Sequence, residues 1–263
     1  MSQFLSYPGA AEALMTLLAV GGLLGVVGVP MVLTGRSFSG LVLAAAAGLG
    51  GTIGHITGLS PWLLAFVASL GSLAAVELLP TKRGRTDGTL AAAYIFLIAA
   101  ATLIISKLPC AHVDILRLQF GNILTLPRPV ALRFVVLAGV GIAYTLTVQR
   151  HVLAAVGDKT CAALAGLRPR IALAGHALLV SLAVTLGLEA LGIIPVCACL
   201  VSPGYIALRL ARSRAGWTAI ALAVTSTAAS IGLVVAFALD FPPGVFVAGL
   251  LGGTALLVWL LRG

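Results

Sequence analysis

The chain has 263 residues and a mass of 26.6 kDa; 60% of its residues are hydrophobic, only 9% are charged, and the mean hydropathy is +1.16. A soluble domain is roughly half apolar and a quarter charged, so this composition excludes a soluble globular enzyme, a disordered chain and a nucleic-acid-binding domain. The net charge of +9 instead indicates the cytoplasmic rim of a membrane protein, where basic residues gather.

Two further features of the sequence narrow the class. The four cysteines show no paired spacing in a soluble loop, so we expect no disulfide framework. No basic residue precedes the first apolar run, which argues against a cleaved signal peptide. We therefore expect an all-α, polytopic integral membrane protein that forms one transmembrane domain over residues 1–263.

Apolar runs of about 20 residues, the length that a helix needs to cross a bilayer, follow one another between proline, glycine and charged residues. They predict eight or nine transmembrane helices, over residues 12–34, 38–58, 61–79, 89–106, 130–148, 171–190, 192–208, 216–238 and 244–261. Small residues recur four apart in the first two runs, as in Gly21-xxx-Gly25, Ala44-xxx-Gly48 and Gly50-xxx-Gly54. This spacing lets helix backbones approach closely, although glycine is also simply common in membrane helices.

Basic residues are unevenly divided between the two sides that these segments define. With the N-terminus outside, twelve of the sixteen basic residues and three of the seven acidic residues lie inside. The outer side then carries no net charge, and the inner side carries the whole +9. Because basic residues accumulate in cytoplasmic loops, this division predicts an outer N-terminus and a cytoplasmic C-terminus.

Two connections are longer than the rest. Within the outer one, residues 107–129, the pattern predicts a short interfacial helix. Within the inner one, residues 149–170, we expect a second short helix, with Asp158 as its N-cap and Gly166 as its C-terminal stop. A short helix at the membrane surface, flanked by basic residues, suits the docking of a soluble partner; the alternative is an ordinary amphipathic loop.

Four segments resemble, in order, motifs of one family. Residues 157–166 (GDKTCAALAG) resemble the G-D-x-x-A-x-x-L-G cytoplasmic loop of importer permeases of the metal and siderophore/cobalamin type. Residues 114–124 (DILRLQFGNIL) resemble D-x-x-x-x-L-F-G-D/N-I-L, residues 192–212 resemble the family's proline-containing helix, and residues 240–244 (DFPPG) resemble D-x-P-x-G. The chain is thereby similar, over about residues 30–261, to the zinc/manganese/iron-type permease family of ATP-binding-cassette (ABC) importers.

The resemblance implies the fold of a type II ABC importer and the partners of such a machine. These are a second copy of the chain, one ATPase subunit beneath each copy, an extracytoplasmic solute-binding protein and the lipid bilayer, here the inner membrane of a bacterium. The inner segment would be the coupling helix that binds the ATPase, through Gly157, Asp158, Ala162, Leu164 and Gly166. The chain has no Gly-x-x-x-x-Gly-Lys-Ser/Thr phosphate loop, so we expect no enzymatic activity and no bound cofactor, with ATP hydrolysed by the partner.

The second predicted helix departs from the family pattern where a metal would be expected. Members of the family carry an Asp there and a His four residues later, and residues at this spacing share one helical face. Gly40 and Ala44 occupy the corresponding positions, and neither has a side chain that binds a metal. The resemblance therefore leaves the metal ligands of this chain unknown.

Other residues offer ligands along the expected substrate pathway. His55 lies near the outer end of the second helix, where it either binds metal or forms an ordinary hydrogen bond. Cys197 and Cys199 form a Cys-x-Cys pair, and thiolates suit zinc, although buried cysteines usually behave as small hydrophobic residues. Glu189 and Asp240, both near the outer side, are expected to attract an arriving cation or to pair with the binding protein.

The outer loop and the sixth predicted helix hold further polar groups. Cys110, His112 and Asp114 alternate along the loop and offer soft and hard ligands at the entrance; the alternative is a polar loop with solvated charges. His176 lies inside the sixth helix, where a polar group is costly, and we expect it to hydrogen-bond to a neighbouring helix.

Together these features predict a permease that imports a divalent transition metal, zinc first and manganese or iron next, by alternating access driven by the ATPase. The missing Asp/His pair leaves open a chelated metal or a non-metal solute carried by the same machinery. Two further functions stay open: a secondary ion-coupled transporter, for which Glu77, beside Lys82 at the cytoplasmic end, is the nearest candidate carboxylate, and an assembly subunit without transport.

Overall fold

The computed structural model describes residues 9–78, 85–107, 111–121, 123–157 and 169–262. Within these ranges the chain forms helices and no strand, which confirms the expected all-α class. The elements are α2 (Ala10–Leu33), α3 (Ser37–Thr57), α4 (Pro61–Leu78), α5 (Arg85–Ile105), α6 (Ala111–Phe120), the 3-10 helix η1 (Ile123–Thr125), α7 (Arg128–Gly157), α9 (Pro169–Leu191), α10 (Ile193–Leu210), α11 (Arg214–Ala238) and α12 (Pro243–Arg262).

A long helix occupies each of the nine segments predicted to cross the membrane, and α6 is the helix predicted in the outer loop. Eight of the described helices have the length and apolar composition to cross a membrane; α4, over its described side chains, is a shorter apolar helix. The prediction for α7 was too short, because the helix continues past residue 148 to Gly157. The first residue of this extension packs against a neighbour: Thr218 of α11 donates a 3.0 Å hydrogen bond to the side-chain oxygen of the buried Gln149.

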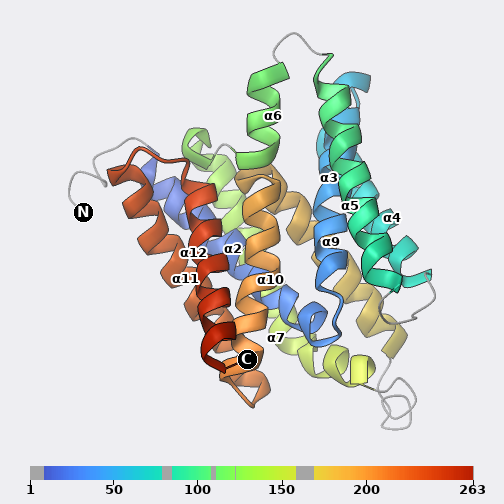
Figure 1. Ribbon diagram of the computed structural model, residues 1–263, viewed down its shortest axis with the longest axis vertical. Helices are drawn as coiled ribbons and strands as arrows, with labels where there is room; N and C mark the ends of the chain where they lie inside the picture. The colour runs from blue at the N-terminus through green and yellow to red at the C-terminus, as the bar shows by residue number, and fades with distance from the viewer. Residues whose placement is uncertain (1–8, 79–84, 108–110, 122, 158–168, 263) are drawn as a thin grey trace.

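The long helix α7 connects the two ends of the molecule. It begins at the end where α6 lies, here called the α6 end, and finishes at the opposite end, directly before residues 158–168 (Figure 1). The expected coupling helix, with Asp158, Ala162, Leu164 and Gly166, lies outside the described residues, as does Cys110. The C-terminal turn of α12 also lies away from α6.

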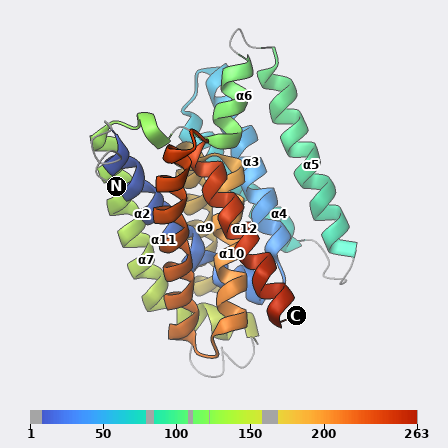
Figure 2. The ribbon, with the colours of Figure 1, turned by 60° about the vertical axis from the view of Figure 1, so that its left-hand side comes forward.

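Helix α2 is the central element of the bundle, with α7, α9, α10 and α11 packed around it (Figures 1 and 2). In the most apolar 18-residue stretch of α2, 78% of the residues are buried inside the molecule. A Cβ at Gly21 would lie 3.1 Å from Cγ2 of Thr225, and one at Gly25 would lie 2.8 Å from Oγ1 of the same residue. The Gly21-xxx-Gly25 spacing therefore does bring α2 close to α11, as predicted.

The approach of α2 to α10 is closer still. A Cβ at Gly28 would overlap the backbone carbonyl group of Leu200. Because a main-chain carbonyl cannot rotate aside as a flexible side chain can, only glycine allows this crossing.

Helices α3, α4 and α5 form a second group beside this bundle (Figure 1). A Cβ at Gly50 would overlap the carbonyl oxygen of Leu64, and one at Gly54 would overlap the backbone of Pro61. The Gly50-xxx-Gly54 pair thus holds α3 and α4 together backbone to backbone. As expected for the glycine-rich second span, α3 is largely buried among helices.

At the α6 end, two glycines with left-handed backbone conformation face each other. Gly121, which follows α6, has φ +72°, and Gly192, between α9 and α10, has φ +83°. A Cβ on either residue would overlap main-chain atoms of the other segment. The N–H of Gly121 also donates a 2.8 Å hydrogen bond to the carbonyl oxygen of Arg117, which closes the end of α6. Helix α6 is therefore fixed on the junction of α9 and α10.

Candidate functional site

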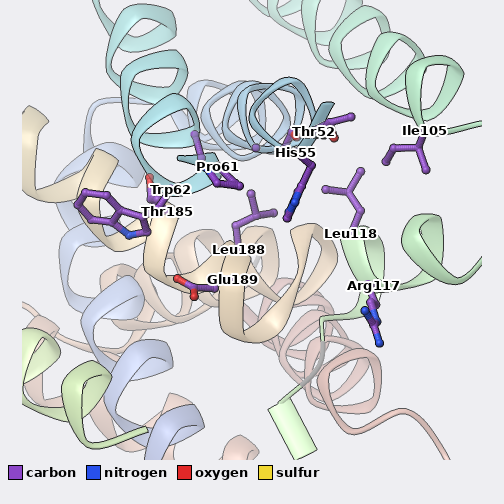
Figure 3. A pocket seen from close by; sticks show the side chains of 13 residues that line it. Thr52, His55, Pro61, Trp62, Ile105, Arg117, Leu118, Thr185, Leu188 and Glu189 are labelled. Atoms are coloured by element: carbon purple, nitrogen blue, oxygen red, sulfur yellow. Dashed lines mark hydrogen bonds between the residues drawn. The ribbon is translucent and has the colours of Figure 1, made fainter. Parts of the chain in front are cut away.

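A cavity of about 550 Å³ lies at the α6 end, among α3, α4, α5, α6 and α9 (Figure 3). Apolar side chains form most of its wall. Its polar side chains come from four different helices and are Thr52, His55, Trp62, Arg117, Thr185 and Glu189. The fold thus gathers around one space residues that are far apart in the sequence.

The last turns of four helices contribute residues to the wall of this cavity. His55 lies in the last turn of α3, Arg117 in the last turn of α6 and Glu189 in the last turn of α9, while Ile105 is the final residue of α5. The carbonyl groups of a last helical turn carry partial negative charge, and here those of Arg117 and Leu188 accept hydrogen bonds from the N–H groups of Gly121 and Gly192. Four such ends, together with the carboxylate of Glu189, favour a bound cation.

The remaining polar groups of the wall are fixed by local contacts. Thr52 donates a 2.9 Å hydrogen bond to the carbonyl oxygen of Gly48, and Thr185 donates one of 2.8 Å to that of Ser181. Each hydroxyl oxygen keeps lone pairs that can accept a hydrogen bond from a ligand. The ring of Trp62 is stacked on that of Phe66 of the same helix, with centroids 5.9 Å apart.

His55, Glu189 and Arg117 are the three side chains that can recognise a charged ligand. Figure 3 shows them around the cavity on α3, α9 and α6. Among the described residues, no hydrogen bond or ion pair engages any of the three. Their polar atoms are therefore available to a ligand.

The cavity does not hold a complete metal site of its own. Across the described ranges, no three His, Cys, Asp or Glu residues come together in a group that could hold a metal ion. His55 and Glu189 supply two potential ligands. Gly40 and Ala44 are buried, and no residue from Gly40 to Gly51 has a side chain that binds a metal, so α3 adds none along this stretch.

The Cys-x-Cys pair is placed elsewhere. Cys199 is fully buried on α10, with its Sγ 3.6 Å from the position that a Cβ would take at Gly21. Cys197 is partly buried and packs against the same core. Both are free thiols and neither lines the cavity. Their surroundings are those of small apolar residues.

The other predicted candidates are not among the described residues that line the cavity. Asp240 is exposed between α11 and α12, with φ +55°. His112 and Asp114 lie on α6, where their side chains fall outside the described part of the structure. His176, on α9, is the one whose expected hydrogen bond is missing: within the described residues its Nε2 has no partner.

The structure also adds residues that the sequence did not single out. Arg117 stood out in the sequence only as a charge on the outer side, and Thr52, Trp62 and Thr185 belonged to apolar runs. No local pattern marks them, because the cavity wall exists only once α3, α4, α6 and α9 are packed together.

Comparison with known proteins agrees with this architecture. The chain is 25% identical over 236 residues to the "Probable iron transport system membrane protein" of Haemophilus influenzae, covering 89% of this chain and 86% of that protein. It is 26% identical over 212 residues to the "Manganese transport system membrane protein MntC" of Halalkalibacterium halodurans, covering 79% and 72%. Its fold matches a chain of PsaBC from Streptococcus pneumoniae, solved in complex with Fab, with a TM-score of 0.85, 19% identity, and coverage of 98% and 93%.

The match to a family extends over almost the whole chain. Residues 6–262 match the family described as "ABC 3 transport family". This range takes in all the described helices, including those that build the cavity. The chain is thus a multi-helical membrane protein that belongs to the ABC 3 transport family.

Proposed function

We propose that this chain is the membrane permease of an ATP-driven importer of a divalent transition metal. One observation carries the proposal: residues from the last turns of four helices, among them His55 and Glu189, line one cavity at the end of the molecule opposite Gly157, the last residue of α7. A carboxylate and an imidazole are ligands that divalent transition metals accept. The names of the relatives in Haemophilus influenzae and Halalkalibacterium halodurans, which refer to iron and manganese, support a metal as the substrate.

The proposal places iron and manganese ahead of zinc. The sequence resemblance put zinc first, and that preference remains an untested prediction. The relatives from Haemophilus influenzae and Halalkalibacterium halodurans carry the names of iron and manganese systems. The side chains around the cavity offer a nitrogen and an oxygen ligand, which iron, manganese and zinc all accept, so the names of the relatives alone support this order.

Membership of the ABC 3 transport family supports a set of partners for the proposed importer. A second copy of the chain would complete the pathway, and an ATPase subunit would bind each copy through residues 157–166. With the N-terminus outside and the C-terminus in the cytoplasm of a bacterium, the cavity would lie at the outer surface of the inner membrane. There it would face an extracytoplasmic binding protein. Closure of the ATPase pair would then rock the two copies between outward-open and inward-open states.

Reconstitution tests the proposal directly. The chain would be assembled in proteoliposomes with its ATPase and binding protein, and uptake of radioactive manganese(II), iron(II) and zinc(II) would be measured separately. We expect uptake of at least one ion with ATP, and none when the ATPase carries an inactivating substitution. Uptake that needs an ion gradient but no nucleotide would identify a secondary transporter instead. An assembled complex that moves no metal would identify an assembly subunit or a non-metal substrate.

A further inference from the structure

We infer that the end of the molecule away from α6 carries a binding site for an anionic phospholipid, whose phosphate group is held by Arg209 and Arg262. The site lies between the last turns of α10 and α12. It shares no residue with the cavity at the α6 end, and it does not depend on which substrate the chain transports.

The packing of α10 against α12 brings together two arginines that are 53 positions apart in the sequence. Nη1 of Arg209 donates a 3.3 Å hydrogen bond to the carbonyl oxygen of Arg262, and Nη1 of Arg262 donates one of 3.3 Å to the carbonyl oxygen of Arg209. Both residues lie in the last turn of their helix, where carbonyl groups lack partners within the helix. This exchange places the two guanidinium groups, here called the arginine pair, side by side.

The arginine pair needs a negative partner. Each guanidinium group has five N–H donors, of which the carbonyl contact uses only one, and within the described residues neither group is paired with a carboxylate. Arg209 also lies over the ring of Tyr205, 5.5 Å from its centroid, a contact that holds the side chain without neutralising it. The exposed Arg212 and Arg214, which follow along the chain, add to the positive potential. The free donors suit an anion with several oxygens, such as a phosphate.

The surface next to the arginine pair is apolar and exposed. Helix α12 is long and apolar enough to cross a membrane, and only 22% of its most apolar 18-residue stretch is buried inside the molecule. Its last turns before Arg262 carry the exposed side chains of Leu256, Leu257, Trp259, Leu260 and Leu261. Tryptophan at the end of a membrane helix is typical of the level of the lipid headgroups. Acyl chains therefore cover the leucines while the phosphate reaches the arginines, so the ligand is a phospholipid and not a free phosphate ion.

Two other partners fit this surface less well. A symmetric contact with a second copy of the chain would bring two arginine pairs against each other, and like charges repel. A soluble ATPase would leave the exposed leucines of α12 uncovered. An anionic phospholipid complements both the charge and the apolar face, as lipids do in basic sites between transmembrane helices.

A purely structural role must be separated from lipid recognition, because a basic residue in a last helical turn also stabilises its helix. The full-length chain, purified in detergent, would be titrated with phosphatidylglycerol and, separately, with phosphatidylcholine. Native mass spectrometry would count the lipids and the copies of the chain in each complex. The ratio of the two affinities, here called the lipid preference, does not depend on how much of a variant folds.

We expect the wild type to bind phosphatidylglycerol at least tenfold more tightly than phosphatidylcholine. Arg209→Gln/Arg262→Gln should lower the lipid preference about tenfold or more, because each basic residue at a membrane surface strengthens the binding of an anionic lipid about fivefold. Arg209→Lys/Arg262→Lys should keep most of it, since the charge remains. The matched control is Arg212→Gln/Arg214→Gln, which removes two exposed charges outside the arginine pair and should lower the preference about twofold at most.

Three results would overturn the inference: equal affinity of the wild type for the two lipids, an unchanged preference in Arg209→Gln/Arg262→Gln, and an equal fall in the control variant. A wild-type dimer that binds no lipid and that separates in Arg209→Gln/Arg262→Gln would assign the surface to a second copy. Loss of ATPase binding with an unchanged lipid preference would assign it to the ATPase. Either outcome would also overturn the inference, and none of these results bears on metal uptake, which tests the proposed function.

Discussion

His55 and Glu189 show how individual residues acquire a role from the turns that hold them. Each lies in the last turn of its helix, so its side chain reaches the cavity while the carbonyl groups of that turn add negative potential around it. Glu189 is exposed on the wall of the cavity and is not buried in the apolar interior. Its charge is therefore compatible with folding and remains available to a cation.

Removing the charge of Glu189 should impair transport. We expect Glu189→Gln to lower the rate of metal uptake about tenfold at limiting substrate, because a charge-assisted contact is replaced by a weaker neutral one. Uptake by the reconstituted complex measures the effect. Asp240→Asn is the matched control: it removes the same charge from an exposed residue outside the cavity, and Asn tolerates the φ of +55° at that position. Equal losses in both variants would contradict a specific role for Glu189.

The two cysteines of α10 should be dispensable for metal binding. We expect Cys197→Ala/Cys199→Ala to bind and transport metal as the wild type does, because neither thiol reaches the cavity. Thermal stability should fall slightly, by about 1 kcal/mol, since a small cavity is left beside Gly21. Metal content of the purified protein, measured by mass spectrometry, checks the first expectation. Loss of one bound metal per chain in this variant would show that the two cysteine thiolates do bind metal.

Among the elements, the crossing of α2 and α10 sets the spacing of the bundle. The two helices touch through their backbones at Gly28 and Leu200. Since helices in a membrane gain little from the hydrophobic effect when they associate, close packing of this kind provides much of their attraction.

Enlarging Gly28 should therefore destabilise the protein. We expect Gly28→Ala to cost about 3 kcal/mol or more, because the new methyl group overlaps a main-chain carbonyl and the helices must separate. Thermal unfolding of the detergent-purified protein measures the loss. Gly139→Ala serves as the control, since no atom lies within 4 Å of its added Cβ and its Tm should stay the same or rise slightly. A Tm for Gly28→Ala equal to that of the wild type would disprove the close crossing.

The helices themselves could be predicted from the sequence because each long apolar run has the length of a membrane span. The end of α7 could not, because Gln149, Arg150 and His151 interrupt the apolar pattern, whereas the helix continues through them to Gly157. The cavity could be predicted only in part. His55 and Glu189 were singled out as polar residues near the outer side, but Arg117 gains its meaning only from the packing of α6 beside α3 and α9.

At the scale of the whole molecule, the cavity and Gly157, the residue directly before the expected coupling segment, lie at opposite ends. Helix α7 runs the full distance between them and is tied to α11 by the hydrogen bond from Thr218 to Gln149. A push on residues 158–168 would therefore reach two helices at once. This arrangement suits a machine that is powered from one side and loaded from the other.

Changing the coupling segment should separate ATP hydrolysis from transport. We expect replacement of residues 158–164 by a Gly/Ser sequence to abolish metal uptake while the assembled complex still hydrolyses ATP, because the flexible segment transmits no push. Both rates would be measured in the same proteoliposomes. Arg212→Ala, an exposed change in the connection between α10 and α11 at the same end, should affect neither rate strongly. Uptake that persists after the replacement would show that the drive enters elsewhere.

The glycine contacts join helices at the α6 end into two groups. Gly121 and Gly192 hold α6 against the α9–α10 junction, so Arg117 and Glu189 belong to one group. Gly50 and Gly54 bind α3 to α4, so His55 belongs to the other. A motion of one group relative to the other, with both groups intact, would separate the imidazole of His55 from the carboxylate of Glu189. A cavity built in this way would release its metal when the two groups of helices separate.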